Sequence, residues 1–430
     1  MRHDTTSRRS VLKTIGAAGV GIACVGTVSG ADRDRYLVTG DNDRNRLETS
    51  EFTVHTEFSD ANVYLVEGPE GSSEELRSID GVQGVTPDLS YSVDVPDLGP
   101  ADDESGSEAD QWDNELVDSF AANEYATGEG TQVGIIDTGV AYGHPDLGNL
   151  NTDLSRAFVD GEELDDADDV HYHGTHVAGI AGATGEEYVA GIAPETELVS
   201  LRVFPSEGPL LASVSDTFLA LEYAAENGLD VVNMSIGSPP YPAWENADAA
   251  RDGFRVAREQ MLRSVVQRGT TVVVAAGNEA TNIQRGNECR TVENEDGEEE
   301  EVCARWFQLW GSLQHSISVS ATTAEDELAS FSNYGVPHVD VGAPGANVLS
   351  TLDPDNEALP GAEYANLSGT SMASPQVAGL TALVAELAPD QHPNQDERAI
   401  KHGADLVEGE SDPEFGAGRI NALETVERLR

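Results

Sequence analysis

Beyond residue 111 the sequence alternates short apolar segments with longer amphipathic ones, which leaves few folds open to it. Runs rich in β-branched residues predict strands over residues 132–136, 197–203, 231–234, 272–275 and 317–321. Helical periodicity predicts helices over residues 214–227, 251–268 and 372–387. Strands that alternate with helices form a parallel sheet covered on both faces, so we predict an α/β, doubly wound fold. In such sheets the working side chains gather at the carboxyl ends of the strands.

Three reactive residues stand where this geometry would bring them together. Asp137 follows the strand 132–136, and His173 opens the segment H-G-T-H-V-A-G. Ser371, in G-T-S-M-A-S-P, lies at the start of an apolar helix, where free N–H groups favour negative charge. A serine needs a histidine as its base, and a carboxylate holds that histidine in the correct tautomer. We therefore interpret Ser371 as nucleophile, His173 as general base and Asp137 as the orienting group.

Asn278 adds a fourth component. It follows the strand 272–275 in the segment A-G-N-E, which places an amide side chain at another strand end. Such an amide can donate a hydrogen bond to a developing oxyanion, together with the backbone N–H of Ser371.

These four segments resemble those of subtilisin-like serine proteases (subtilases), and the sequence is similar to the halolysins of salt-loving archaea. The resemblance runs from about residue 111 to the closing segment F-G-A-G-R-I-N, residues 415–421. It implies a subtilisin-like serine endopeptidase with Asp137, His173 and Ser371 as its triad, in the family's order, and Asn278 as its oxyanion donor. The implied substrates are proteins or peptides, and no cofactor is required for catalysis.

The resemblance also implies substrate-binding residues. Ser235, Ile236 and Gly237 follow the strand 231–234 and resemble the segment that pairs with the substrate backbone as an added strand. Gly277, next to Asn278, is assigned to the same surface.

Structural calcium enters only through the resemblance. Asp146, in H-P-D-L, matches a calcium ligand of the family. Residues 183–189 lie where many subtilases carry a calcium-binding loop, but they are fewer and lack its asparagine pattern. Asp146 is thus a candidate ligand without an assigned partner loop. The acidic cluster 165–169 is either a second calcium site or a solvated loop.

The N-terminal part divides into three segments. Residues 1–31 carry S-R-R-S-V-L-K and a short Gly/Ala-rich apolar run, which predicts a twin-arginine signal and secretion. Residues 32–95 form a small α+β unit that resembles the family's inhibitory propeptide, which also assists folding. Residues 96–110 are an acidic, proline-flanked linker of the kind that proteases cut, and residues 111–430 form the catalytic domain. We expect the precursor to cut itself between about residues 95 and 111.

The charge balance points to a salt-rich setting. The chain has 24 Lys+Arg against 78 Asp+Glu, for a formal net charge of −54. Such a surface repels nucleic acid and anionic lipid, which argues against both as partners. Concentrated salt would screen its self-repulsion, so we predict a halophilic protein, and we expect a monomer.

Three cysteines occur. Cys24 lies in the signal segment, where the residues before it form a poor lipidation signal, so we favour soluble release over a lipid anchor. Cys289 and Cys303 remain for the folded part and are predicted to form a disulfide, with two free buried thiols as the alternative.

Three other functions compete with this reading. A non-catalytic relative that only binds proteins would need a broken triad, whereas all four residues are present. An esterase or lipase of the α/β-hydrolase type would need G-x-S-x-G and the order Ser…Asp…His. A metal site at His171, His173 and His176 lacks the H-E-x-x-H pattern of zinc proteases.

Overall fold

The computed structural model describes residues 26–27, 29–30, 33–40, 44–93, 99–100, 111–236, 247–285, 289–293, 299–303, 310, 313–405 and 412–430. Most of the predicted signal segment, including Cys24, and most of the predicted linker lie outside these residues, as does Gly237.

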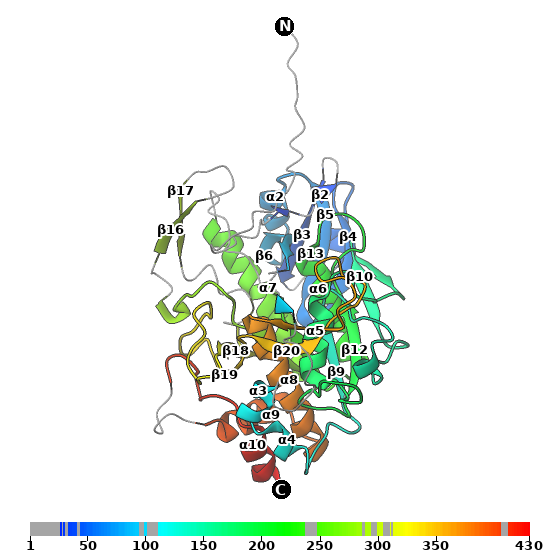
Figure 1. Cartoon of the computed structure of the whole chain (residues 1–430). Helices are drawn as coiled ribbons and strands as arrows, with labels where there is room; N and C mark the ends of the chain where they lie inside the picture. The colour runs from blue at the N-terminus through cyan, green and yellow to red at the C-terminus, as the bar shows by residue number, and fades with distance from the viewer. Residues whose placement is uncertain are drawn as a thin grey trace.

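An eight-stranded sheet forms the centre of the molecule (Figure 1). Its strands follow the order β11-β10-β12-β9-β14-β15-β18-β19, and every neighbouring pair is parallel except β10 and β11. Their bounds in chain order are β9 (Gln132–Asp137), β10 (Arg156–Val159), β11 (Glu162–Leu164), β12 (Glu197–Arg202), β14 (Val231–Met234), β15 (Thr271–Ala275), β18 (Ile317–Thr322) and β19 (Val341–Pro344). The predicted α/β fold is confirmed, and all five predicted strands are present.

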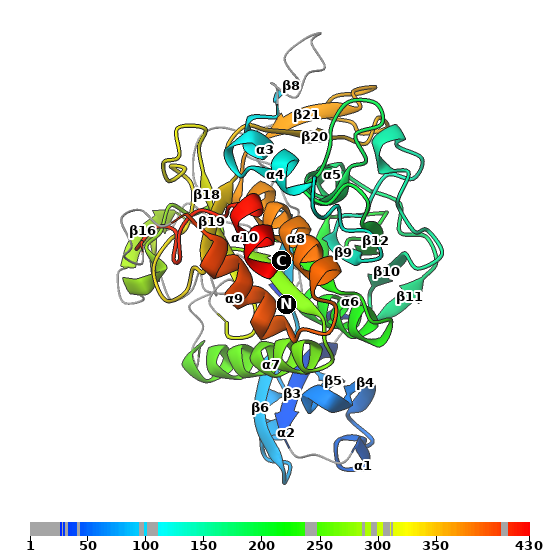
Figure 2. The same ribbon diagram turned by 90° about the horizontal axis from the view of Figure 1, so that it is seen from below.

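Helices cover both faces of this sheet, as Figure 2 shows. Residues alternate along each strand, so Val133 and Ile135 of β9 face one core while Ile136 faces the other. The first core includes α5 (His173–Gly182), α8 (Thr370–Leu387), α9 (Pro393–Gly403) and α10 (Ala422–Leu429). The second core includes α6 (Val214–Glu226) and α7 (Ala247–Gln267). In the part of the chain that the structure describes, no helix has the length and apolarity to span a membrane.

The N-terminal unit has a small sheet of its own, in the order β2-β3-β5-β4, and β6 also pairs with β3. Its elements are β2 (Ser29–Gly30), β3 (Arg33–Gly40), α1 (Arg44–Leu47), β4 (Thr53–Phe58), β5 (Val63–Pro69), α2 (Ser73–Arg77) and β6 (Val82–Pro87). This sheet packs against α7, which lies across it in Figure 2. Leu37, Phe58 and Leu65 share the second core with α6 and α7, and the Phe58 and Phe218 rings meet edge to face at 5.6 Å.

Two short pairings join the chain on either side of residues 94–98 to the catalytic unit. β7 (Leu89–Ser92) lies antiparallel between β1 (Gly26–Thr27) and β13 (Leu211–Ser213). β8 (Gly99–Pro100) pairs with β21 (Tyr364–Leu367), which in turn pairs with β20 (Val348–Thr351).

The acidic insertion after Asn278 includes a hairpin of β16 (Cys289–Glu293) and β17 (Glu299–Cys303). Cys289 and Cys303 are directly opposite each other in its register. Their side chains are not among the described ones, so the disulfide stays a prediction, and this backbone register is compatible with it.

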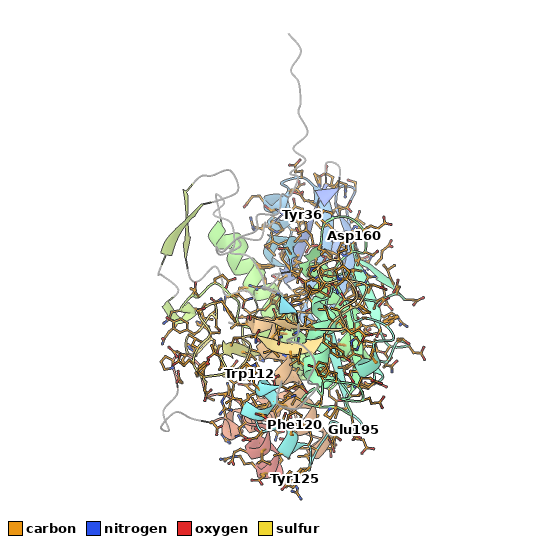
Figure 3. The ribbon with its side chains drawn as sticks, in the orientation of Figure 1. Tyr36, Trp112, Phe120, Tyr125, Asp160 and Glu195 are labelled. Carbon is orange, nitrogen blue, oxygen red and sulfur yellow. The ribbon has the colours of Figure 1, made fainter. Side chains whose placement is uncertain are left out.

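The N-terminal unit and the C-terminal residues lie at opposite ends of the molecule. Figure 3 places Tyr36 in the N-terminal unit and Tyr125 at the far end, where the Arg430 guanidinium lies 4.3 Å from the Tyr125 ring centre. Two short helices, α3 (Trp112–Leu116) and α4 (Ser119–Ala122), pack near this end.

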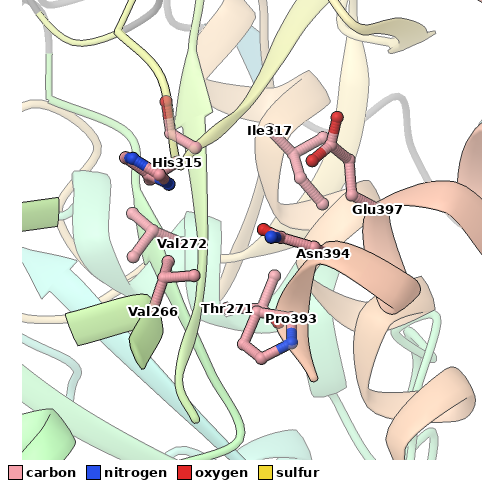
Figure 4. Close-up of a pocket in the computed structure, with 9 residues that line it drawn as sticks. Val266, Thr271, Val272, His315, Ile317, Pro393, Asn394 and Glu397 are labelled. Carbon is pink, nitrogen blue, oxygen red and sulfur yellow. The ribbon is translucent and has the colours of Figure 1, made fainter. Parts of the chain in front are cut away.

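A small pocket at the amino ends of β15 and β18, shown in Figure 4, is lined by His315, Asn394 and Glu397 among others. It lies at the edge of the sheet opposite to the strand ends that carry the predicted site.

Candidate active site

The topology gathers the predicted site residues at one edge of the sheet. From β9 the chain continues to β12 on one side and then returns to β14 on the other, so a switch point lies at the carboxyl end of β9. Asp137 is the last residue of β9, and Ser235 directly follows β14. Asn278 follows β15, while α5 begins at His173 and α8 begins one residue before Ser371.

His173 and Asp137 form a buried pair. The distance from His173 Nδ1 to Asp137 Oδ1 is 2.8 Å, and both side chains have no solvent exposure. The backbone N–H of Thr138 donates to the same carboxylate oxygen at 2.7 Å. Because a carboxylate only accepts hydrogen bonds, Nδ1 carries the proton, and Nε2 is left as the basic nitrogen of a neutral ring.

Close backbone contact between β9 and α5 makes this pairing feasible. A Cβ atom at Gly174 would lie 2.1 Å from the Gly139 carbonyl oxygen and 3.1 Å from Asp137 Cβ, so only glycine fits in the second position of H-G-T-H. The Gly174 N–H also donates to the Thr138 hydroxyl at 2.9 Å.

Asp169 holds these two elements together, a role that the sequence did not reveal. Its carboxylate accepts the Thr138 hydroxyl at 2.8 Å and the Thr175 N–H at 3.0 Å, and it accepts the Thr175 hydroxyl as well. Burial raises the pKa of Asp169 to about 6. Asp169 had been grouped with the acidic cluster 165–169, and the only sequence signal that singles it out is its place four residues before His173.

Ser371 is held at the first turn of α8. Its hydroxyl donates to the Ser235 carbonyl at 3.0 Å, and the Ser235 hydroxyl donates back to the Ser371 carbonyl at 2.8 Å. Ser371 is 3% exposed. The helix starts here, so its positive dipole end lies beside the hydroxyl.

The Asn278 side-chain nitrogen and the Ser371 backbone nitrogen border the same space. The Asn278 Oδ1 atom accepts the Thr370 N–H at 2.8 Å and the Thr370 hydroxyl at 2.9 Å, which turns its Nδ2 group the other way. A Cβ atom built on Gly369 would lie 3.6 Å from both Asn278 Nδ2 and the Ser371 backbone nitrogen. An amide N–H and a backbone N–H bordering one point form the arrangement that stabilises an oxyanion.

The three neighbouring histidines have different surroundings. His176 is fully buried with Nε2 3.0 Å from the Ala365 carbonyl, and burial lowers its pKa to about 3. His171 stacks on the Tyr172 ring at 3.8 Å, and burial together with the neighbouring His173 lowers its pKa to about 4. Among the described residues, no group of three histidine, cysteine or acidic side chains is placed to hold a metal ion.

Ser235, Ile236 and Gly277 all lie at this edge. Ser235 and Ile236 are buried, and the Gly277 N–H donates to the Thr370 hydroxyl at 3.1 Å. The sequence analysis does not predict β13, which pairs with β7. A strand of three residues is too short to give a periodic signal.

The fold and this cluster of residues define a serine hydrolase of the subtilisin type, and the known proteins agree. Residues 128–418 match the sequence profile of the subtilase family, peptidase S8. The chain is 33% identical over 401 residues to an alkaline protease of Alkalihalobacillus alcalophilus, covering 91% of this chain and 90% of the relative. It is 35% identical over 313 residues to Subtilisin Savinase of Lederbergia lenta, covering 72% of this chain and 96% of the relative.

The crystal structure of an epidermin leader peptide processing serine protease from Staphylococcus aureus has the same fold. It superposes with a TM-score of 0.71 at 21% identity, covering 92% of this chain and 98% of that one. The chain therefore belongs to the subtilase family and is a subtilisin-like serine protease. Family membership excludes the α/β-hydrolase alternative.

Replacement of Asn278 tests the oxyanion arrangement. We expect Asn278→Ala to lower kcat by about 10²–10³-fold with little change in KM, because its amide donor acts mainly in the transition state. Asn278→Asp keeps the acceptor for Thr370 but loses the Nδ2 donor, so it should lose at least as much activity while remaining as stable as the parent. Steady-state kinetics on a peptide substrate and thermal unfolding measure the two effects. An Asn278→Asp variant with full activity would contradict the assignment.

Proposed function

We propose that this protein is a secreted serine endopeptidase that hydrolyses peptide bonds through an acyl-enzyme on Ser371. The observation that carries the proposal is the buried 2.8 Å contact between His173 and Asp137, at the same sheet edge as the Ser371 hydroxyl. Nucleophile, base and orienting carboxylate thus come from three different elements, β9, α5 and α8.

Each residue has a defined task in this mechanism. The Ser371 Oγ atom attacks the carbonyl carbon of the scissile bond while its proton passes to His173 Nε2. The Asp137 carboxylate accepts the hydrogen bond from His173 Nδ1–H and stabilises the imidazolium cation. The Asn278 Nδ2 group and the Ser371 N–H bind the oxyanion. His173 then gives its proton to the leaving amine. In the second half of the reaction His173 takes a proton from water, which attacks the ester carbonyl, and then gives that proton to the Ser371 oxygen.

A fluorophosphonate reagent tests the nucleophile directly. We expect the active protein to lose peptidase activity as one reagent molecule attaches per chain, with the label on the peptide that contains Ser371 by mass spectrometry. Labelling of another serine with loss of activity would contradict the proposal.

We further propose that residues 32–95 are an inhibitory propeptide that assists folding. Asp88 supports this assignment, because it is fully buried at the start of α6. Its carboxylate accepts the Ser215 N–H at 3.0 Å and hydroxyl at 2.6 Å, and the Arg35 guanidinium lies 3.2 Å away. Burial raises the pKa of Asp88, and the Arg35 charge opposes this shift. An anion at a helix N-terminus joins the two units electrostatically as well as through their shared core.

The precursor should cut itself between residues 95 and 111. Support comes from the pairings of β7 with β13 and of β8 with β21, which attach the chain to the catalytic unit before and after residues 94–98. We expect purified wild-type precursor to be trimmed in this region at a rate independent of protein concentration, as an intramolecular reaction requires. Purified Ser371→Ala precursor should stay intact, as judged by intact-mass measurement. Trimming of that variant at the wild-type rate would refute self-processing.

Export by the twin-arginine route, release without a lipid anchor on Cys24, and a monomeric state complete the proposal. One relative of this chain, from Xanthomonas campestris, is an extracellular protease that is 32% identical over 333 residues. Protein or peptide substrates follow from the family. No nucleic acid is expected as a partner, because the formal net charge is −54.

We also propose adaptation to concentrated salt. The 78 acidic side chains repel one another, and only 24 Lys and Arg side chains offset their negative charge. Several cations of the described region are already engaged, such as Lys401 with Asp340 at 2.6 Å and Arg268 with Glu222 at 2.7 Å. Added salt must therefore supply the remaining screening.

The unfolding midpoint is expected to fall steeply below about 0.5 M NaCl and to keep rising beyond about 1 M, where the Debye length is already about 3 Å and simple screening is complete. The further rise would reflect salt-strengthened burial of apolar surface. Thermal unfolding of Ser371→Ala protein, in NaCl and in a neutral excluded osmolyte, separates the two effects because the osmolyte supplies no screening. Equal stability at about 0.05 M and in molar salt would overturn the halophilic proposal and leave the protease assignment intact.

A further inference from the structure

Asp146 is fully buried in the short turn Pro145–Leu147, and four donors converge on its carboxylate. Its Oδ1 atom accepts the Glu187 N–H at 2.7 Å. Its Oδ2 atom accepts the Tyr188 N–H, the Val189 N–H and the Tyr364 hydroxyl, each at 2.9 Å. Oδ2 thus accepts three hydrogen bonds and Oδ1 accepts one, so these donors engage both oxygens of the carboxylate.

The three N–H donors come from successive residues of one loop, residues 183–190. Successive N–H groups that converge on one point form a concave anion-binding site. A calcium ion instead needs six to eight oxygen ligands at about 2.3–2.6 Å. At Asp146 the loop presents hydrogen-bond donors, so a cation there would face the positive ends of three peptide groups.

The oxygen atoms at the neck of the loop are also in use. The Ala190 carbonyl accepts both Gln111 Nε2 and Asn114 Nδ2 at 2.8 Å, and Gln111 Oε1 accepts the Ala190 N–H at 3.0 Å. The Ala183 carbonyl accepts the Gly191 N–H at 2.8 Å. The Ala190 carbonyl, with two donors, has both lone pairs engaged and would have to give up a hydrogen bond to contact a metal ion.

Aromatic rings close the site on its remaining side. The Tyr364 ring meets the His144 ring edge to face at 5.3 Å and the Tyr188 ring at 4.8 Å. His144 Nδ1 accepts the Asp146 N–H at 3.2 Å, and its Nε2 lies 2.9 Å from the Glu363 carbonyl. Burial and the adjacent Asp146 charge both raise the pKa of Tyr364, so its hydroxyl keeps the proton that it donates.

We infer that Asp146 is not a calcium ligand in this protein, and that its carboxylate holds the 183–190 loop by direct hydrogen bonds in place of a metal ion. Asp146 matches a calcium ligand of the family, but here hydrogen-bond donors surround its carboxylate. The carboxylate therefore acts as a positioning residue for the loop that follows α5.

Calcium titration of stability tests the inference, with Ser371→Ala as the parent so that autolysis does not interfere. In molar NaCl we expect Asp146→Asn to lower the unfolding midpoint by about 5 °C, because an amide cannot accept all four donors. The shift caused by millimolar calcium, measured against chelator, should be the same in parent and variant. Asp153→Asn, an exposed acidic residue in the segment after the Asp146 turn, is the matched control and should change neither quantity.

A calcium-dependent rise in the parent that Asp146→Asn abolishes would overturn the inference. If Asp146→Asn does not fold, Tyr364→Phe removes one donor and should lower the midpoint less, again with the calcium response unchanged. Hydrogen exchange gives a second readout on the parent. We expect the amides of residues 187–189 to be equally protected in chelator and in calcium, and protection that appears only with calcium would also overturn the inference.

Discussion

Ser371→Ala is expected to lower kcat by about 10⁶-fold, with the remaining rate coming from substrate binding and the oxyanion donors. The Ser371 hydroxyl is the proposed nucleophile, and alanine leaves the helix and the backbone N–H of residue 371 in place. Single-turnover hydrolysis of an activated peptide ester, with the variant purified in molar salt, measures the loss without interference from self-processing.

A matched control separates loss of the nucleophile from loss of a buried hydroxyl. Thr381 lies in the same helix, is fully buried, and donates to the Val377 carbonyl at 2.7 Å. We expect Thr381→Ala to retain activity within about twofold, since the hydroxyl serves only the helix. Substantial peptidase activity in Ser371→Ala, above what contamination explains, would remove Ser371 from the mechanism.

The sequence predicts those elements whose local residue pattern agrees with their place in the fold. Valine-rich runs such as β14 and β15 are buried on both faces in a parallel sheet, so they stand out as continuous apolar segments. The ends of β9 and β15 predict where Asp137 and Asn278 lie. The structure brings both to the edge where α5 and α8 begin.

Contacts between distant segments could not be predicted in this way. Asp169 looks like one acid among four in the cluster 165–169, because its bonds to Thr138 and Thr175 depend on how β9 and α5 meet. Asp88 gave no signal either, since its partners Arg35 and Ser215 lie 53 and 127 residues away in the chain. Partner choice of this kind is set by tertiary packing, for which a single sequence has no periodicity.

The Asp146 site shows a different limit. The H-P-D-L segment carried the family's expectation of calcium, yet a carboxylate serves equally well as a metal ligand or as an acceptor for N–H groups. Only the backbone of residues 187–189 decides between these roles, because it presents donors to the carboxylate.

Asp137→Asn is expected to lower kcat by about 10⁴-fold, as the loss of the orienting carboxylate does in related and unrelated serine proteases. The contact from His173 Nδ1 to Asp137 Oδ1 is 2.8 Å and wholly shielded from solvent, so the carboxylate fixes the tautomer. An asparagine can turn its NH₂ group toward Nδ1, which would place the ring proton on Nε2 and remove the base. It also removes the charge that stabilises the imidazolium.

Asp230→Asn is the control for this change, because Asp230 accepts the Gln132 N–H at 2.8 Å at the opposite end of the same strand. Its loss should affect stability but leave kcat within about twofold of wild type. Fluorophosphonate labelling adds a readout that a purely structural role would not move. Asp137→Asn should react at Ser371 far more slowly while unfolding near the wild-type midpoint, since serine activation depends on the His173 base. Wild-type labelling and turnover in Asp137→Asn would mean that another group orients His173.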